Sequence, residues 1–411
     1  MSAAYFLELT AVIFSGIFVG VITGLIPGLH VNLVSAIVLF YSPAFFFTVG
    51  LEKLAVFIFA VAVTHTIVDF IPTIFLGASD NENNISHLPG HRLLLKGKAK
   101  RAVMLCISGC LISAVLIIFL SAPLFSLTSF LYGKIRGLVA VLLMLISALF
   151  ILGENTIRKK ILAFVIFIVS GAFGVIVLNL NMGNPLLAML SGLFGVSALL
   201  SSLNSSPVIP RQSGDKFNIE NSKLVRISLA GIASSALVSI LPSLSASHAT
   251  HLGAKTTQLK NYSKNPDEED ENFLILTGSV SMAVTLMAVV TAVAIHKARN
   301  GAVVAMEKLA VLNFDFVVLL IFSLLIVLGF SVLGVILLSR IFLNIISRID
   351  YRKLCLSIIF MLFSIIFYFD GLMGIIVLFT ATAIGTLALL FRVKRNTTMA
   401  CLIVPVIFYF L

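Results

Sequence analysis

Long apolar stretches, separated by short polar interruptions, follow one another along almost the whole chain. In the first half they lie at about 4–26, 29–48, 52–78, 102–131, 135–153, 159–181 and 185–203. In the second half they lie at about 224–252, 273–296, 301–338, 341–347 with 354–369, 371–391 and 398–411. A stretch of about 20 apolar residues suffices for one helix that crosses a bilayer. The pattern therefore predicts an all-α polytopic membrane protein with about 10–12 transmembrane helices.

Three polar interruptions are longer than the others, and they lie at Ser79 to Arg101, Asn204 to Ser222 and Lys255 to Asn272. The last contains an acidic run from Asp267 to Glu271, which is typical of a solvated loop. A cation site in that run is the alternative. The middle interruption divides the chain and predicts a first transmembrane repeat at 1–203, a polar linker at 204–223 and a second transmembrane repeat at 224–411.

Two segments, one in each half of the chain, resemble each other. The first, GIFVGVITGLIPGLHVNL, begins at Gly16, and the second, GIASSALVSILPSLSASH, begins at Gly231. The shift in numbering that superimposes Gly16 on Gly231, here called the repeat offset, also superimposes Pro27 on Pro242. It keeps a small residue at every fourth position of both segments. Such spacing lets two helices approach closely in lipid, so packing is one explanation of Gly16, Gly20 and Gly24. The repeat predicts two related halves of the chain.

The proline that ends each repeated helix is less easily explained by packing. Proline removes a backbone donor, and at membrane depth the freed polar groups must be buried in protein or face water. Paired broken helices in two halves are typical of a transporter binding site. Helices that restart after Pro27 and Pro242 would direct their N-terminal N–H groups toward this site, and such groups favour anions. A kinked packing defect is the alternative.

Short polar side chains surround both turns and suit hydrogen bonds to a carboxylate or a phosphate. We therefore expect an anionic substrate to bind between the two proline-broken turns. The candidate binding residues are Pro27, Gly28, His30, Asn32, Pro242, Ser243, Ser245, Ser247 and His248.

An ionisable pair, His65 and Asp69, lies inside the third apolar stretch. The two residues are four positions apart and therefore share one helix face. Ionisable groups within a span are costly and mark functional sites that face the protein interior. Coupling to H⁺ or Na⁺ is the hypothesis for this pair, and a structural hydrogen-bonded pair is the alternative. No other cofactor and no metal site is expected.

The composition supports the membrane assignment and narrows the function. The 411 residues are 60% hydrophobic and 11% charged, whereas soluble domains are about 45–50% apolar and about 25% charged. A soluble enzyme is excluded, and so is a transmembrane β-barrel, whose strands alternate in polarity. The net charge of +11 lies in short clusters between the apolar stretches, which is typical of topology signals rather than of nucleic-acid binding. Cys106 and Cys110, one helical turn apart, are expected to be buried hydrophobes.

An intramembrane enzyme is the alternative from another class of protein. The H-E-x-x-H zinc motif is absent. The segment Gly77 to Asp80 only faintly resembles the motif of an intramembrane aspartyl protease, and Asp315 and Asp370 are expected at the membrane interface near the ends of spans. No catalytic residue is therefore predicted.

Together these motifs resemble the TctA family, the large membrane subunit of tripartite tricarboxylate transporters, and in particular its short archaeal-type members. The glycine-rich helix ending in Gly24 to Leu29 is similar to the family's G-x-x-P-G-L turn. The segment Asp69 to Pro72 resembles its proline-broken hairpin, and Leu88 to Ala102 resembles the basic stretch that follows. The second turn, Leu241 to Leu244, departs from the family pattern by carrying Ser243 where glycine is usual.

The resemblance implies two inverted repeats, with two proline-broken or re-entrant hairpins that meet at the midplane and hold the substrate there. It further implies uptake of a tricarboxylate-like organic anion by a multi-pass protein of the cell membrane. It also implies two partners, a small membrane subunit and an extracytoplasmic binding protein, and a homodimer is a further hypothesis. A related branch that moves polyprenyl-phosphate lipids gives the alternative function, a lipid-carrier translocase or flippase.

Overall fold

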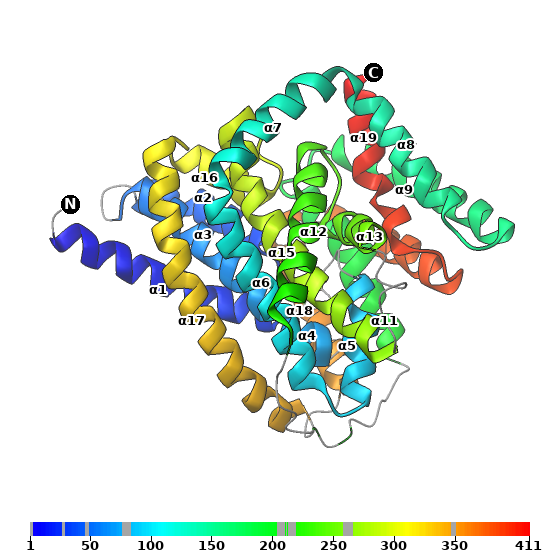
Figure 1. The fold of residues 1–411 in the computed structure, drawn as a ribbon. Helices are drawn as coiled ribbons and strands as arrows, with labels where there is room; N and C mark the ends of the chain where they lie inside the picture. Colours follow the sequence, from blue (N-terminus) through cyan, green and yellow to red (C-terminus); the bar gives the residue numbers. More distant parts are fainter. Residues whose placement is uncertain are drawn as a thin grey trace.

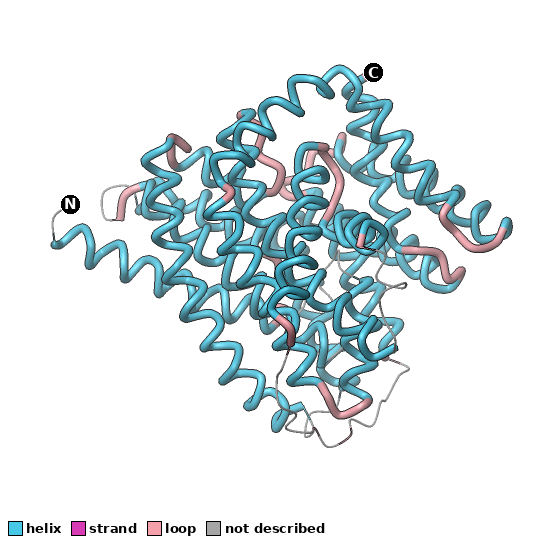
Figure 2. The backbone as a smooth tube through the Cα atoms, in the orientation of Figure 1, coloured by secondary structure: helices cyan, strands magenta, loops and turns pink. Residues whose placement is uncertain are grey.

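A computed structural model describes residues 3–26, 29–45, 49–75, 84–203, 210, 212, 219–257, 266–346 and 351–411. Throughout these ranges the regular structure is helical (Figure 2). The helices of the first half are α1 (Ala3–Leu25), α2 (Val31–Phe45), α3 (Leu51–Val68), α4 (Phe70–Phe75), α5 (Asn84–Leu95), α6 (Ala99–Phe119), α7 (Ser121–Ile135), η1 (Arg136–Leu138), α8 (Val139–Leu152), α9 (Ile157–Leu178), α10 (Pro185–Leu190), η2 (Ser191–Val196) and α11 (Ser197–Ser202).

The second half has fewer and longer helices (Figure 1). They are α12 (Asn221–Ile240), α13 (Ala246–Thr256), α15 (Pro266–Ile295), α16 (Gly301–Leu309), α17 (Phe314–Ile346), α18 (Tyr351–Leu390), η3 (Arg395–Met399) and α19 (Ala400–Phe410). Most of the predicted linker, at 204–209, 211 and 213–218, lies outside the described residues, so the division at 204–223 stays a prediction.

The described part of the chain contains nine helices that are long and apolar enough to cross a membrane. Three shorter apolar helices accompany them, at Val31–Phe45, Pro185–Ser201 and Arg395–Phe410. Many large apolar side chains on the outer surface are exposed, as the surface of a protein in lipid requires. The prediction of an all-helical, multi-pass membrane protein is confirmed.

The 40-residue helix α18 is broken at Gly371, where the backbone has φ 60° and ψ −146°. Glycine tolerates this conformation because it has no Cβ atom. The break separates the two apolar stretches that the sequence predicts at 354–369 and 371–391. Asp370, expected at the end of a span, lies at this break, and its carboxylate accepts a hydrogen bond from the Asn184 N–H (2.8 Å).

The glycines of α1 are packing positions. A Cβ atom added to any of the three would lie 2.6–2.8 Å from a Cβ atom of α3, and the facing pairs are Gly16 with Ala60, Gly20 with Thr64 and Gly24 with Val68. Because each residue is four positions from the next on both helices, the two backbones stay in close contact along three turns.

The repeat offset extends far beyond the two proline turns. It carries the first residues of α2, α3, α6 and α10 onto the first residues of α13, α15, α17 and α19, respectively. Packing partners also exchange between the halves, since α3 packs against α17 while α6 packs against α15. Figure 1 shows that α6 and α17 run in opposite directions. These observations support a twofold structural repeat, and its inverted orientation in the membrane stays a prediction.

Candidate functional site

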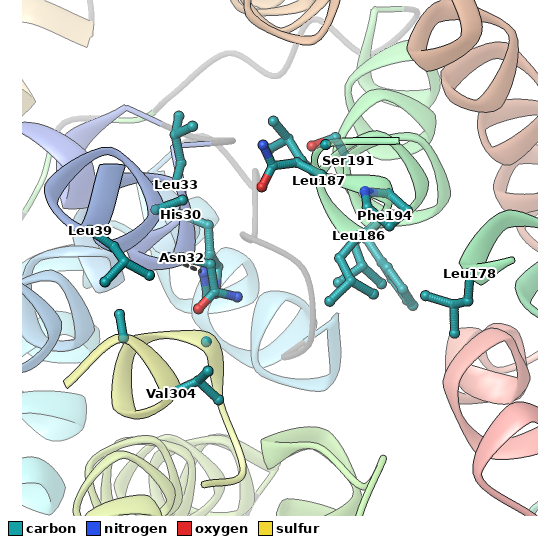
Figure 3. A pocket seen from close by; sticks show the side chains of 17 residues that line it. His30, Asn32, Leu33, Leu39, Leu178, Leu186, Leu187, Ser191, Phe194 and Val304 are labelled. Atoms are coloured by element: carbon teal, nitrogen blue, oxygen red, sulfur yellow. Dashed lines mark hydrogen bonds between the residues drawn. The ribbon is translucent and has the colours of Figure 1, made fainter. Parts of the chain in front are cut away.

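A cavity of about 420 Å³ lies where α2, the helix Pro185–Ser201 and α16 meet (Figure 3). Its wall is mostly apolar, with leucines from the first two helices and Phe194 from η2. The polar side chains on the wall are His30, Asn32, Asn184 and Ser191. Among the described residues that line it there is no Asp, Glu, Lys or Arg.

Three helices begin at this cavity. His30 precedes the first residue of α2, Asn184 precedes Pro185, and Gly301 is the first residue of α16, and all three line the wall. The first N–H groups of a helix have no partner within the helix, and the helix dipole places partial positive charge there. The converging N-termini therefore make the cavity attractive to an anion without a lysine or arginine.

His30 connects the cavity with the predicted coupling pair. Its Nδ1 accepts a hydrogen bond from the Asn32 N–H (3.2 Å), which assigns the proton of the neutral ring to Nε2. The His30 and His65 ring centroids are 5.8 Å apart, and His65 Nδ1 lies 3.2 Å from Thr23 Oγ1 on α1. A row of polar groups thus leads from α1 through α3 to the cavity.

Asp69 lies directly after α3 and is half-buried. Its N–H donates to the His65 carbonyl oxygen (2.9 Å), so the two residues are one helical turn apart, as their spacing predicts. Their assignment to ion coupling remains a prediction.

The second proline turn forms a separate cluster. Ser243 has φ 65° and donates to the Leu402 carbonyl oxygen (3.0 Å). Ser245 and His248 form a reciprocal N-terminal cap of α13, in which Ser245 Oγ lies 2.8 Å from both Ser247 Oγ and His248 Nδ1.

This cluster is closed off by packing. Ser245, Ser247 and His248 are buried, and the His248 ring stands edge-on to Phe150 with centroids 4.7 Å apart. None of the candidate residues from Pro242 to His248 lines the cavity. Pro27 and Gly28 lie outside the described residues. The structure thus brings together His30, Asn32 and His65.

One wall of the cavity is a π-helix that the sequence analysis does not identify. Ser191 and Phe194 of η2 line the cavity. A π-helix replaces the usual i→i−4 bonding and often marks a functional site. Arg395 Nη2 donates to the carbonyl oxygens of Leu193 and Phe194 and to Ser197 Oγ, each at 2.8 Å. Arg395 is therefore a buried support of the wall.

Two further residues of the wall, Asn184 and Gly301, were missed, although the sequence carries a local signal for the helix start at each. Asn184 precedes Pro185, and proline is favoured in the first turn of a helix. Asn300 precedes Gly301 and caps α16, because its Oδ1 accepts a hydrogen bond from the Val303 N–H (2.8 Å). Such signals locate the helix starts, but only the tertiary structure shows that these starts meet.

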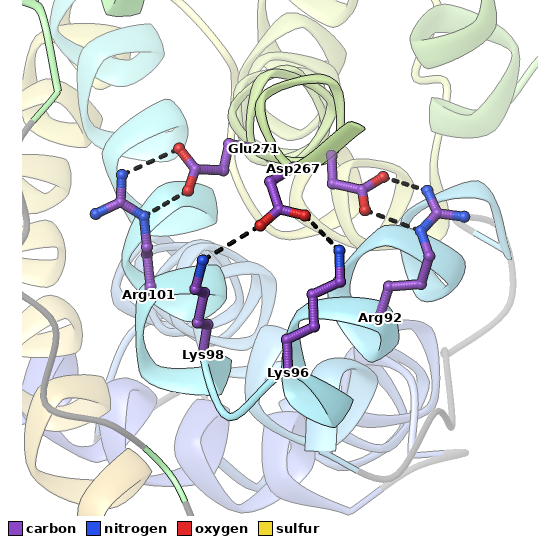
Figure 4. A network of polar contacts seen from close by, with 7 residues as sticks. Arg92, Lys96, Lys98, Arg101, Asp267 and Glu271 are labelled. Atoms are coloured by element: carbon purple, nitrogen blue, oxygen red, sulfur yellow. Dashed lines mark hydrogen bonds and ion pairs between the residues drawn. The ribbon is translucent and has the colours of Figure 1, made fainter. Parts of the chain in front are cut away.

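The acidic run from Asp267 to Glu271 is not a loop, which corrects the sequence-based expectation. It forms the first turns of α15 and pairs with the basic residues around the α5–α6 connection (Figure 4). Asp267 pairs with Lys96 and Lys98, and the bidentate pairs are Arg92 with Asp270 and Arg101 with Glu271. The run can form a helix because these cations neutralise it.

Fold and site together define a multi-pass helical membrane protein in which short helices begin at a mostly apolar cavity with a few polar side chains, an arrangement typical of transporters. The chain belongs to the tripartite tricarboxylate transporter TctA family, whose sequence profile matches residues 10–400. It is also 28% identical over 393 residues to an uncharacterized protein of Methanocaldococcus jannaschii, MJ1079, with 93% of this chain and 94% of that protein covered. No solved structure matches the chain. The predicted family is confirmed, and it is a family of transporters rather than of enzymes.

Proposed function

We propose that this chain is the large membrane subunit of a transporter for a carboxylate-bearing organic anion, and that the anion binds in the cavity between α2, Pro185–Ser201 and α16. The observation that carries the proposal is the meeting of three helix N-termini at a cavity of about 420 Å³, which no acidic side chain of the described residues lines. This volume lies within the range typical of small-molecule sites.

The wall of the cavity offers both hydrogen-bond donors and an apolar surface, and an organic anion can contact both. His30, Asn32 and Ser191 can donate to carboxylate oxygens, and the leucines and Phe194 contact the carbon skeleton. Asn32 is held closely against the start of α16, since a Cβ atom on Gly301 would lie 2.7 Å from Asn32 Oδ1. A change in the position of α16 would therefore move a substrate-binding side chain.

The row from Thr23 through His65 to His30 supports ion coupling at the same cavity. An imidazole can both accept and donate a proton, so the row offers a path by which a proton reaches the substrate. His65→Asn should abolish proton uptake coupled to substrate in proteoliposomes that contain a pH-sensitive dye, while substrate binding persists. Undiminished proton uptake in this variant would exclude His65 from coupling.

The family description supports two partners for the chain. A tripartite transporter contains further components, for which we propose a small membrane subunit and an extracytoplasmic binding protein, and a homodimer is a further arrangement to measure. Co-purification from the native host, followed by mass determination of the complex, tests all three.

The binding site is tested by thermal stability in the presence of tricarboxylates. Asn32→Ala should lower tricarboxylate affinity about 10- to 100-fold, because one hydrogen bond to a charged group is lost. The matched control is Asn155→Ala, at an exposed position that does not line the cavity. Equal affinities in the two variants would contradict the site.

Two further experiments distinguish the alternative substrate and the role of the second proline turn. Stabilisation by a polyprenyl phosphate, but by no carboxylate, would favour the translocase. The variant Ser245→Ala tests whether the second proline turn contributes to substrate binding. If it does, the affinity falls as with Asn32→Ala, and the double variant does not bind. If Ser245 serves only as a cap of α13, the variant loses about 1 kcal/mol of stability and keeps its affinity.

A further inference from the structure

The structure separates the basic clusters of the chain into two kinds. Around the α5–α6 connection, Arg92, Lys96, Lys98 and Arg101 all pair with carboxylates of α15 (Figure 4). A second group, Arg158, Lys159 and Arg392, forms no ion pair with any described residue. Carboxylates of the described residues therefore neutralise the first group and not the second.

The three unpaired cations line one cavity. Its volume is about 280 Å³, and it lies between the start of α9 and the end of α18. Thr156, which caps α9 by accepting a hydrogen bond from the Lys159 N–H (3.3 Å), completes its polar wall. No carboxylate lines it among the described residues. The positive end of the 22-residue helix α9 adds to the field of the three side chains.

The nearest carboxylate along the chain, that of Glu154, is engaged in a different interaction. Glu154 is buried, and its Oε1 accepts a hydrogen bond from the Lys394 N–H (2.9 Å). Lys394 Nζ in turn donates to the Gly153 carbonyl oxygen (2.8 Å). These bonds join the α8–α9 connection to the segment after α18. They hold the two sides of the cavity together and leave its cations available.

The other side of the cavity is apolar and adjoins exposed apolar side chains at the start of α9. Leu162, Leu390 and Phe391 line it, and the neighbouring side chains of Ile157 and Ile161 are largely exposed. A free anion needs no apolar neighbour. A phospholipid presents a phosphate directly above its acyl chains, so it can contact both kinds of surface at once.

We propose that the cavity between α9 and α18 binds the phosphate headgroup of an anionic membrane phospholipid. Arg158, Lys159 and Arg392 contact the phosphate, and the acyl chains lie against Ile157, Ile161 and Leu390. The lipid joins the α8–α9 hairpin to the end of α18, and it is a stabilising ligand rather than a transported substrate.

The test compares thermal unfolding of the protein in nanodiscs of phosphatidylcholine alone and of phosphatidylcholine with phosphatidylglycerol. Phosphatidylglycerol should raise the Tm, because a ligand that binds only the folded state stabilises it. The triple variant Arg158→Gln, Lys159→Gln, Arg392→Gln should lose most of this rise and keep the wild-type Tm in phosphatidylcholine. Its Tm in phosphatidylcholine also shows that the variant folds.

The matched control removes the same charge from exposed positions elsewhere, as Lys134→Gln, Arg136→Gln, Arg340→Gln. The control should keep the phosphatidylglycerol-dependent rise. An equal loss in both triple variants would reduce the effect to general surface charge and overturn the site. A similar rise caused by inorganic phosphate in phosphatidylcholine nanodiscs would assign the cavity to a free anion instead, and this also overturns the proposal.

Discussion

Thr64 on α3 and Ser279 on α15 occupy equivalent positions under the repeat offset, and each hydroxyl bonds to a serine hydroxyl on a helix of the other half. Thr64 Oγ1 lies 2.9 Å from Ser331 Oγ on α17, and Ser279 pairs with Ser113 on α6. A second relationship follows the same offset. Glu8 pairs with Lys53 in the first half, and Lys223 pairs with Glu268 in the second, with the charges exchanged. The repeat therefore preserves contacts as well as helix boundaries.

The bond between Thr64 and Ser331 should contribute measurably to the attachment of one half to the other. Thr64→Val keeps the shape and removes the hydroxyl, and Ser331→Ala removes the partner. The coupling energy of the double-mutant cycle should be about 0.6 kcal/mol and at most about 1.7, the range found for such bonds between transmembrane helices. Reversible unfolding in mixed micelles measures it. Additive effects of the two substitutions would show that the bond contributes nothing.

The opposite directions of α6 and α17 predict that equivalent residues lie on opposite sides of the membrane. Lys100 and Asp315, each the second residue of its helix, are equivalent under the repeat offset. A membrane-impermeant thiol reagent should label Lys100→Cys from one side of oriented vesicles and Asp315→Cys only from the other. The four native cysteines are buried and give little background. Labelling of both positions from one side would establish a parallel repeat.

The helix breaks could be predicted from the sequence because proline and glycine act locally. Pro242 follows the end of α12, and the break at Gly371 falls between the apolar stretches that the sequence predicts at 354–369 and 371–391. The helical conformation of the acidic run at the start of α15 could not be predicted in this way. It depends on cations that lie far away in the chain, in the first half. The residues that line the cavity could likewise be predicted only in part. His30 and Asn32 were predicted, whereas Asn184 and Gly301 join them only through tertiary packing.

The contact between α1 and α3 should tolerate no added carbon atom at Gly20. A Cβ atom there would lie 2.6 Å from Thr64 Cβ and 3.0 Å from the Val61 carbonyl oxygen. Gly20→Ala should therefore destabilise the protein by about 1–3 kcal/mol, the usual cost of overpacking. The control is Gly329→Ala on α17, which meets nothing within 4 Å and should be neutral or stabilising by up to about 1 kcal/mol. Equal thermal stabilities of the two variants would contradict close packing at Gly20.

The pair of Arg92 with Asp270 should stabilise the start of α15 over a wide pH range. The hydrogen bond to Asp270 raises the pKa of the Arg92 guanidinium above its ordinary value. Stability from a raised pKa is present below the unfolded-state pKa and is lost only above the folded-state pKa, so Arg92 contributes no pH dependence between about pH 6 and about pH 9.

Because about half of the Arg92 side chain is exposed, solvent screening limits the loss in Arg92→Gln to about 1 kcal/mol. The additional substitution Asp270→Asn should recover part of this loss, because it removes the buried charge that is left without its cation. Chemical unfolding at low and high salt measures both effects. A loss that does not shrink with added salt would show that packing, rather than charge, is responsible.

Arg395 should control the shape of the cavity although it does not line it. Its guanidinium supplies donors to two carbonyl oxygens of η2 and to Ser197, which a lysine ammonium cannot match with the same planar geometry. Arg395→Lys should cost about 1–3 kcal/mol for each buried acceptor left unsatisfied. It should also weaken tricarboxylate binding, because Ser191 and Phe194 shift with the π-helix. The matched control, Arg340→Lys on α17, is exposed and keeps its charge. If both variants bound tricarboxylate equally well, the cavity wall would not depend on Arg395.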